Sequence, residues 1–504
     1  MLSHDQEKQK NQKEDISRLV SRNKFAYLII SFNQGLSSIS ELAVSYYFKD
    51  TLKIEPAKLS QIMSFIAIPW MIKPLFGLIT DLLPICGYRR KIYIILCGLL
   101  NIICWTLMSM ATVDVYGATT LLLLINLGLS FSTVVGEAIV VELSQLSKDD
   151  SSKTKEYVSW FFFCKYVGAL FSAYMKGLLI EKMSLKGVFM IASFLPWLLV
   201  MSGIVLIENV TKKNSPAAQS YGTLGNQETY VETHAETNPA PQAEPNLMKE
   251  FCEFMCKKYV IVPTIFIIVF MATPSYNDPF FYFLTDELKF TPRDLGKISF
   301  FSTLATLIAI WMYQQFFKTC NFKVMITIGS ILSFIFSFCG YILVLRINLK
   351  IGISDFFLVL LSNSFLSMLG ELILMPMLAL AAQLCPKNLE GTVYSLFMSA
   401  LNFGSILSGL NGSFLTSYLG ITSKDYSNLY ILILISNLVG LAPLPMLCCI
   451  DNSYFQPELE SPKETGDIET VALVTKSEDI KNELNKKNEK IEKNELELTN
   501  NDKK

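Results

Sequence analysis

The chain has 504 residues, of which 51% are hydrophobic, and it contains 35 Phe and has a mean hydropathy of +0.39. This composition is too apolar for an ordinary soluble protein, and the net charge of −1 offers no basic field for nucleic acid. Segments 1–24, 208–257 and 451–504 hold 44 of the 87 charged residues. Long apolar blocks between charged segments are typical of a protein that crosses a membrane repeatedly. They exclude a secreted disulfide scaffold, a nucleic-acid-binding protein and a cytosolic enzyme.

Twelve apolar segments are long enough to cross about 30 Å of hydrocarbon. They fall at 25–48, 58–80, 91–112, 116–144, 157–180, 187–207, 258–284, 295–317, 323–346, 355–382, 389–418 and 426–450. The sequence therefore predicts an all-α membrane protein of twelve transmembrane helices, arranged six and six. The predicted parts are an N-terminal tail (1–24), a six-helix bundle (25–207), a disordered linker (208–257), a second six-helix bundle (258–450) and a charged disordered tail (451–504).

The distribution of basic residues predicts the orientation. An even number of helices places both termini on one side, and the loops on that side hold 14 Lys and Arg against 9 in the opposite loops. The positive-inside rule then predicts that both termini are cytosolic. Residues 1–24 mix acidic and basic side chains and show no signal peptide.

Cysteine and histidine give no sign of a disulfide framework or a metal site. The chain has 11 Cys and two His. Cys252 and Cys256 are close in sequence, but neither His4 nor His234 is spaced as a further ligand. No nucleophile with a base, phosphate-binding loop or metal cluster stands out, so we expect no metal, no cofactor and no enzyme.

The two predicted bundles repeat each other in sequence. Residues 45–62 and 281–298 have seven identical pairs at an offset of 236, and Glu137 corresponds to Glu371 at an offset of 234. The seven include Asp50/Asp286 and Lys53/Lys289, and further pairs outside these stretches are Gly168/Gly404 and Ser172/Ser408. A repeat of six helices gives both copies the same orientation around an axis along the membrane normal. This is the arrangement of the two halves in the major facilitator fold.

The loop after the second predicted helix carries a Gly…Asp…Gly-x-Arg-Arg pattern similar to that of facilitator transporters. It consists of Gly77, Asp81, Gly87, Arg89 and Arg90. Gly77 permits close helix approach, Asp81 can cap or pair, and the two arginines can hold the halves together at a cytosolic gate. In the alternative interpretation, the basic residues only orient the chain.

Six ionisable residues fall at membrane depth, where a charge must face a cavity or a partner. They are Glu41, Lys73, Glu137, Lys165, Asp278 and Glu371. Several lie on polar stripes at helical spacing, such as Gln34-Ser38-Glu41-Ser45 and Asn126-Ser130-Thr133-Glu137. Each acid has an alternative as a structural ion pair or a helix-end residue. We prefer that alternative for Glu142 and Asp286, and a cavity-facing role for Glu137 and Glu371.

Prolines predict interruptions in two helices. Pro274 and Pro279 should break the seventh helix, and its freed carbonyl groups can bind substrate or ions, unless the break is a passive kink. In the second helix, Pro69 and Pro74 bracket Trp70 and Lys73. Lys73 beside an aromatic ring suits a carboxylate ligand, but it can equally pair with Glu41 or Glu137.

Stretches in both bundles resemble the folate–biopterin transporter family, a branch of the major facilitator superfamily. They are IPWMIKPLFGLITDLLPICGYRRK (68–91), MATPSYNDPFFYFLTDELKFTPRDLG (271–296), GISD (352–355), MPMLALAAQLCP (375–386) and EGTVYSLFMSALNFG (390–404). The Lys/Asn-rich tails make the chain most similar to apicomplexan folate transporters. The family typically has two acids in the fourth helix. Glu137 matches the second, whereas the first falls at Thr133.

The resemblance implies a proton-coupled carrier of folates and related pterins in the plasma membrane, working by alternating access. Glu137 and Glu371 are then the candidate ion-coupling acids. The candidate substrate-binding residues are Gln34, Glu41, Trp70, Lys73, Lys165, Asp278 and Asn402. Two alternatives stay open: a carrier of another metabolite such as S-adenosylmethionine, and a non-transporting membrane receptor whose linker and tail bind cytosolic partners.

Overall fold

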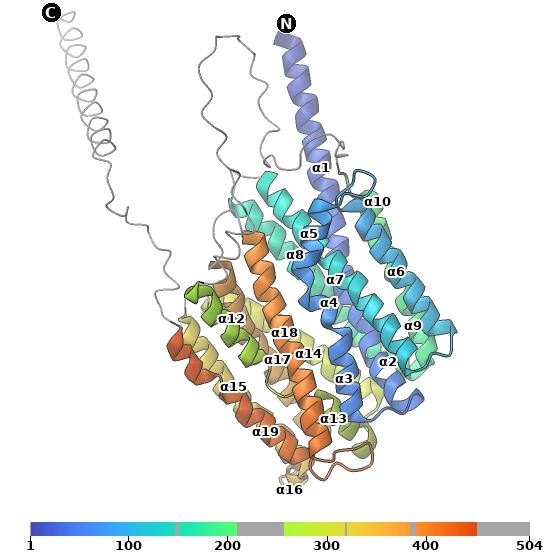
Figure 1. The fold of residues 1–504 in the computed structure, drawn as a ribbon, viewed down its shortest axis with the longest axis vertical. Coiled ribbons are helices and arrows are strands. Elements are labelled where there is room, and N and C mark those ends of the chain that lie inside the picture. Colours follow the sequence, from blue (N-terminus) through green and yellow to red (C-terminus); the bar gives the residue numbers. More distant parts are fainter. Residues whose placement is uncertain (1, 147–150, 209–256, 318–319, 384–389, 451–504) are drawn as a thin grey trace, which may run out of the picture. The chain divides into compact units, whose positions relative to one another are not determined.

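The computed structural model describes residues 2–146, 151–208, 257–317, 320–383 and 390–450. The predicted C-terminal tail, and the predicted linker apart from its end residues 208 and 257, lie outside the described residues. Helices joined by short loops make up most of the described chain (Figure 1). The predicted all-α fold is therefore confirmed.

The helices fall into two sets, called here the first half and the second half. The first half comprises α1 (Leu2–Leu36), η1 (Ser37–Ser40), α2 (Glu41–Tyr46), η2 (Tyr47–Thr51), α3 (Pro56–Ile66), α4 (Ile68–Met71), α5 (Lys73–Leu82), α6 (Lys91–Met110), α7 (Val115–Leu146), α8 (Ser151–Lys182), α9 (Leu185–Phe194) and α10 (Trp197–Val205). The second half comprises α12 (Lys258–Met271), α13 (Asn277–Tyr282), η3 (Phe283–Glu287), α14 (Pro292–Met312), η4 (Tyr313–Phe317), α15 (Phe322–Val344), α16 (Ile347–Lys350), α17 (Asp355–Gln383), α18 (Glu390–Tyr418), α19 (Leu429–Leu441) and η5 (Leu444–Cys449).

Eight helical stretches of the described chain are long and apolar enough to cross a membrane. The other four predicted segments are 25–48, 58–80, 258–284 and 389–418. Where the structure describes them they are mostly helical, with breaks such as that at residues 272–276, and none forms one long apolar helix of this kind. The count of twelve spans stays a prediction.

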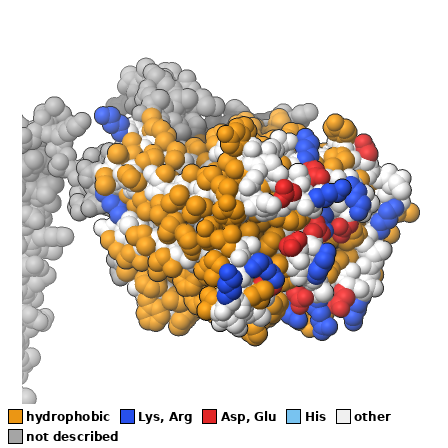
Figure 2. All heavy atoms as spheres, turned by 90° about the horizontal axis from the view of Figure 1, so that it is seen from below, with side chains coloured by type: hydrophobic (Ala, Val, Ile, Leu, Met, Phe, Trp, Pro, Cys, Tyr) orange, Lys and Arg blue, Asp and Glu red, His pale blue; other side chains and the backbone are white. Residues whose placement is uncertain are grey.

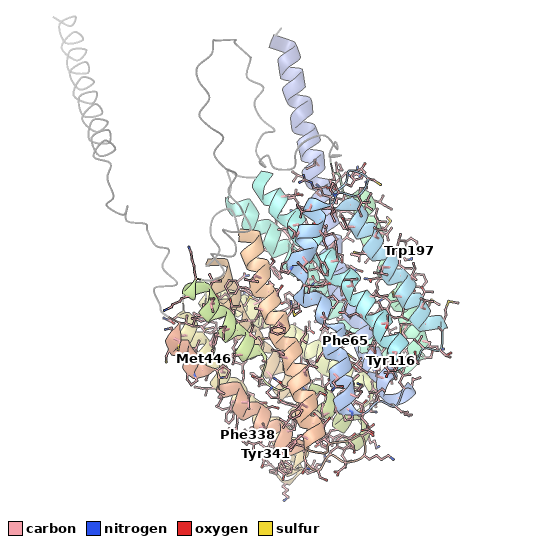
Figure 3. All side chains as sticks on the ribbon, in the orientation of Figure 1. Phe65, Tyr116, Trp197, Phe338, Tyr341 and Met446 are labelled. Carbon is pink, nitrogen blue, oxygen red and sulfur yellow. The ribbon has the colours of Figure 1, made fainter. Side chains whose placement is uncertain are left out.

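Large apolar side chains point outward from many of these helices. Phe65 on α3 is 50% exposed, and Trp197 on α10 is 49% exposed (Figure 3). A surface of this kind is costly in water and suits a hydrocarbon environment. The apolar side chains thus support an integral membrane protein.

The duplicated sequence forms the same structure in both halves. In each copy an α-helix passes into a π-helical turn, η2 or η3, and a lysine with positive φ follows. The φ angle is 53° at Lys53 and 56° at Lys289. Corresponding hydrogen bonds close the turns, 3.0 Å from Ile54 N to Phe48 O and 3.0 Å from Phe290 N to Leu284 O. A left-handed lysine is unfavourable, so its occurrence at both positions is strong structural evidence for the repeat.

The first helix of the first half is interrupted by the 3₁₀ turn η1. Ser172 of α8 donates a hydrogen bond to the carbonyl oxygens of Gly35 and Leu36, at 3.2 and 2.9 Å. The backbones of α1 and α8 are in close contact here, because a Cβ on Gly168 would lie 2.5 Å from the carbonyl oxygen of Phe32. The interruption is therefore held by α8.

The corresponding helix of the second half is broken outright between α12 and α13, as predicted. Ser408 of α18 donates to the carbonyl oxygen of Thr273, and Asn411 donates to that of Ala272 at 2.9 Å. The amide of Ser275 donates to the carbonyl oxygen of Ser408 at 3.0 Å. Two of the carbonyl groups that the break frees are thus bonded to α18 rather than left for a substrate.

The two halves pack on each other through close contacts between helices. A Cβ on Gly296 of α14 would lie only 2.8 Å from the Cα of Gly177 in α8. A Cβ on Gly409 of α18 would lie 2.1 Å from the Oγ of Ser64 in α3. These glycines let the backbones of the two halves approach closely at both packing sites.

Candidate substrate site between the two halves

An ion pair between a buried lysine and a half-exposed glutamate joins α5 and α7 in the first half. Lys73 Nζ lies 3.0 Å from Glu137 Oε1, and the side chains are 4% and 41% exposed. Of the two partners proposed for Lys73, the structure selects Glu137. Because its charge is already compensated at short range, Lys73 is a weaker candidate for binding a carboxylate.

Trp70 lies beside this ion pair and connects three helices. Lys73 Nζ is 5.3 Å from the centre of the Trp70 ring, and the indole nitrogen donates to Asn126 of α7 at 2.9 Å. The carbonyl oxygen of Trp70 accepts from Asn402 of α18 at 3.0 Å, which links the halves. This short helix, α4, lies between interruptions at residues 67 and 72.

Glu371 of α17 is bonded across the two halves. The hydroxyl of Tyr166 in α8 donates to Glu371 Oε1 at 3.1 Å. The neighbouring Lys165 lies 5.8 Å from the centre of the Tyr166 ring, and Lys73, Glu137 and Glu371 are the charged groups close enough to act on it. The structure therefore brings four of the six predicted membrane-depth residues into one neighbourhood.

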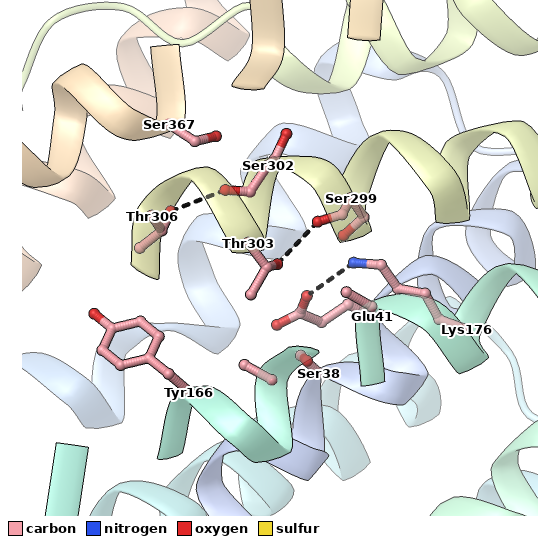
Figure 4. A pocket seen from close by; sticks show the side chains of 11 residues that line it. Ser38, Glu41, Tyr166, Lys176, Ser299, Ser302, Thr303, Thr306 and Ser367 are labelled. Carbon is pink, nitrogen blue, oxygen red and sulfur yellow. Dashed lines mark hydrogen bonds and ion pairs between the residues drawn. The ribbon is translucent and has the colours of Figure 1, made fainter. Parts of the chain in front are cut away.

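A cavity of about 270 Å³ lies between the halves (Figure 4). It is lined from the first half by α8 and by the region of η1 and α2, and from the second half by α14 and α17. We call it the slot. Its charged residues are Glu41 and Lys176, whose Oε2 and Nζ atoms are 4.0 Å apart. Tyr166 also lines it, so the slot borders the Tyr166–Glu371 bond.

The remaining predicted substrate residues lie in different surroundings. Asp278 of α13 accepts a hydrogen bond from Ser60 of α3 at 2.7 Å, in a contact between the halves. The side-chain oxygen of Gln34 is buried and lacks a hydrogen-bond partner within the described part of the chain. Neither residue lines the slot, whereas the predicted Glu41 does.

The predicted gate residues are bonded within the first half. Glu208 accepts from the backbone amides of Arg89 and Arg90, at 2.7 and 3.1 Å, which caps the start of α6. The Arg90 guanidinium pairs with Glu142 of α7 at 2.6 Å, which fits the structural role preferred for Glu142. Gly77 lies on α5, and the side chain of Asp81 lies outside the described residues.

A further group of contacts joins the halves at the end of the molecule away from the start of α1, called here the distal end. Lys49 of η2 lies 2.5 Å from Asp286 of η3 and 3.2 Å from Asp50. Glu55 accepts from the amide and hydroxyl of Ser423, at 2.7 and 2.9 Å. Figure 2 shows this end of the molecule, where acidic and basic side chains are interspersed. The structural role preferred for Asp286 is thus an ion pair between the halves.

Sequence reasoning missed most of the residues that line the slot. Lys176 and Tyr166 were not singled out, nor was the hydroxyl row of Ser299, Ser302, Thr303 and Thr306 on α14. The signal was present, because these hydroxyl residues recur at steps of three and four, as on the other polar stripes. Which of these stripes meet across the halves depends on helix packing, which periodicity alone does not give.

The second half contains a cavity of its own, also of about 270 Å³. The side chains of Ser330, Ser436 and Asn437 line it, and each is buried with a polar atom that has no hydrogen-bond partner in the described chain. Ser337 links Tyr276 to Asn437 through hydrogen bonds of 2.9 and 2.5 Å. The lining carries no charge, and a polar cavity of this kind is large enough for ordered water.

The architecture is that of a transporter of the major facilitator type. The solved nucleoside transporter NupG superposes with a TM-score of 0.60 at 16% identity, covering 84% of this chain and 99% of that one. The chain belongs to the BT1 family, whose pattern matches residues 34–466. It is 33% identical over 422 residues to the folate-biopterin transporter of Synechocystis, covering 84% of this chain and 80% of that protein. It is 31% identical to folate transporter 1 of Plasmodium falciparum, covering 87% and 81%. Family membership confirms a membrane transporter rather than an enzyme.

Proposed function

We propose that this protein carries folates and related pterins across a membrane by alternating access, coupled to protons. The observation that carries the proposal is the slot between the halves of a BT1-family chain. A site lined by both halves is accessible from either side in turn when the halves rock against each other. The relatives named as folate transporters supply the substrate class.

The contacts at the distal end fit alternating access. Opening at this end separates Lys49 from Asp286, Glu55 from Ser423 and Ser60 from Asp278. The carboxylates of Asp286 and Glu55 are partly exposed, so water replaces a lost partner there at small cost, whereas Ser60 is buried. Such contacts can close one end and still release it in each cycle.

Glu371 is the acid that we assign to proton coupling. No ion pair within 4.0 Å holds its charge in the described part of the chain, whereas Glu137 is paired with Lys73. Its carboxylate instead accepts from Tyr166 of the other half. A protonated carboxyl is a weaker acceptor, so proton binding would loosen a contact between the halves. Glu137 then serves mainly to neutralise Lys73.

The remaining assignments follow from the same proposal. Both termini lie in the cytosol, the protein resides in the plasma membrane, and Gly77, Asp81, Arg89 and Arg90 form the gate on the cytosolic side. The parts 1–24, 25–207, 208–257, 258–450 and 451–504 serve as tail, bundle, linker, bundle and tail. Tagging each terminus and testing its accessibility in intact and permeabilised cells checks this orientation.

Uptake of radiolabelled folate into proteoliposomes tests the proposal. The wild-type protein, Glu137→Gln and Glu371→Gln are compared with and without a pH gradient. We expect gradient-driven uptake by the wild type, and loss of the gradient dependence in Glu371→Gln with residual exchange of folate. Absence of folate uptake under every condition would contradict the proposed substrate. A Glu371→Gln protein that keeps its full gradient dependence would remove Glu371 as the coupling acid.

A further inference from the structure

The slot is elongated, and its long axis follows α8. Tyr166, Ala169, Ala173 and Lys176 line it at steps of three, four and three, so they lie on one face of the helix. The ten steps from Tyr166 to Lys176 span about 15 Å at 1.5 Å per residue. One end of the slot is therefore marked by Tyr166 and the other by the pair of Lys176 and Glu41 (Figure 4).

Lys176 is a buried cation with a loosely held partner. Its side chain is 13% exposed, and its nearest carboxylate in the described chain is that of Glu41 at 4.0 Å. Glu41 is itself 69% exposed, so water can solvate its carboxylate when the contact with Lys176 is lost. Lys73 differs, because its partner lies at 3.0 Å. A buried ammonium group requires a counter-charge, and the long distance to Glu41 allows the counter-charge of Lys176 to be exchanged.

The opposite wall of the slot offers hydrogen-bond acceptors. The hydroxyl of Thr303 donates to the carbonyl oxygen of Ser299 at 2.9 Å, and that of Thr306 donates to Ser302 at 3.1 Å. Because their protons are used within α14, these hydroxyl oxygens present lone pairs to a ligand. A ligand with N–H groups along its length matches this wall.

We propose that Lys176 is the anion subsite of the slot, and that it binds a carboxylate at the end of an elongated substrate. The carboxylate replaces Glu41 as the counter-ion of Lys176, and the rest of the substrate extends along α14 toward Tyr166. The proposal rests on the proposed function and deepens it. The glutamate tail of a folate carries carboxylates, whereas biopterin has none, so Lys176 distinguishes the two substrates.

Competition between two carboxylates for one lysine has a consequence for Glu41. In the empty slot Glu41 compensates Lys176, and it must be displaced when the substrate tail arrives. Removing the charge of Glu41 removes this competitor. We therefore expect Glu41→Gln to lower the KM for folate severalfold and to leave the KM for biopterin unchanged.

Uptake of folate and of biopterin is compared in proteoliposomes of the wild type, Lys176→Met and Lys182→Met. Lys182 is the matched control, since it is an exposed lysine of the same helix. We expect Lys176→Met to raise the KM for folate by about tenfold or more, as for the loss of one charge-assisted hydrogen bond. Biopterin uptake should be retained, which also shows that the variant is folded. An equal loss of both substrates, or unchanged folate uptake, would overturn the subsite.

A binding measurement separates this proposal from the proposed function. The thermal unfolding temperature of the purified protein is measured with p-aminobenzoylglutamate, which contains the tail without the pterin ring. This ligand should raise the unfolding temperature of the wild type and of Lys182→Met but not that of Lys176→Met. If the wild type carries neither folate nor biopterin while this difference persists, the proposed function is wrong and the anion subsite stands. Equal stabilisation of Lys176→Met would contradict the subsite whatever the uptake shows. The double variant Glu41→Gln/Lys176→Met repeats the test in a neutral slot in case Lys176→Met unfolds.

Discussion

Glu137 and Glu371 occupy corresponding positions in the two halves, yet their carboxylates are bonded in different ways. Glu137 pairs with Lys73 of its own half, while Glu371 accepts from Tyr166 of the other half. A repeat thus preserves the residue type while its surroundings diverge. In one half the acid balances a buried charge, and in the other it connects two bodies that move relative to each other in the proposed mechanism.

Neutralising each acid in turn is the strongest way to test this difference. Glu137→Gln leaves Lys73 buried without a counter-charge, so we expect a loss of about 3 kcal/mol in stability. Glu371→Gln keeps a side chain that can accept from Tyr166, and should cost less than about 1 kcal/mol. Thermal unfolding in detergent measures both. The double variant Lys73→Gln/Glu137→Gln should recover part of the loss, and equal losses for the two single variants would contradict the distinction.

Tyr166→Phe tests the contact between the halves alone. The change removes the hydroxyl that donates to Glu371 and keeps the ring that lines the slot. Hydrogen bonds to charged groups contribute about 1.5–3 kcal/mol, so gradient-driven folate uptake should fall by about tenfold or more. Tyr174→Phe, an exposed position on the same helix, is the control. A variant with unchanged gradient dependence would separate Tyr166 from the coupling.

At the distal end only one of the two repeated turns carries a lysine that bridges the halves, and two substitutions would move this lysine to the other turn. Lys49 bonds to both repeat-related aspartates, Asp50 and Asp286, and the position that corresponds to Lys49 is Thr285. Lys49→Thr should weaken closure by about 1 kcal/mol, as for partly exposed ion pairs. Adding Thr285→Lys should restore closure, because a lysine on the other side of the axis can reach Asp50.

Labelling of a cysteine introduced at Ser423 reports the opening of the distal end. Its rate should rise in Lys49→Thr and return toward the wild-type rate in the double variant. Each protein with the cysteine at position 423 is compared with the same protein that keeps Ser423. This comparison removes the labelling of cysteines that occur elsewhere in the sequence. A double variant that labels as fast as Lys49→Thr would argue against equivalence of the two turns.

The smallest expected effect concerns a feature that both halves share. Lys53 and Lys289 are exposed and adopt a positive φ, which disfavours a side chain. Replacing either one with glycine relieves this strain but adds backbone entropy to the unfolded chain. We therefore expect each substitution to stabilise the protein by about 0.5 kcal/mol. Similar gains at the two positions in thermal unfolding would support the structural repeat, and opposite signs would contradict it.

Much of the fold could be read from the sequence because it depends on local patterns. Apolar length predicted helices, and the prolines at 274 and 279 predicted the break between α12 and α13. The partner of Lys73 was limited to two acids but not chosen. That choice, like the meeting of Glu41 with Lys176, depends on how helices cross in space. A single sequence shows which face a residue occupies, whereas the neighbour of that face is set by packing over the whole bundle.

The near-touching backbones at Gly177 and Gly296 can serve as a fulcrum for the two halves. α8 begins at Ser151, 26 residues before Gly177, which gives a lever arm of about 39 Å. By simple geometry, a tilt of about 10° around such a point moves the far end by about 7 Å while the glycines hardly separate. A single methyl group at Gly296 would push the backbones of α8 and α14 apart at the point around which the halves tilt.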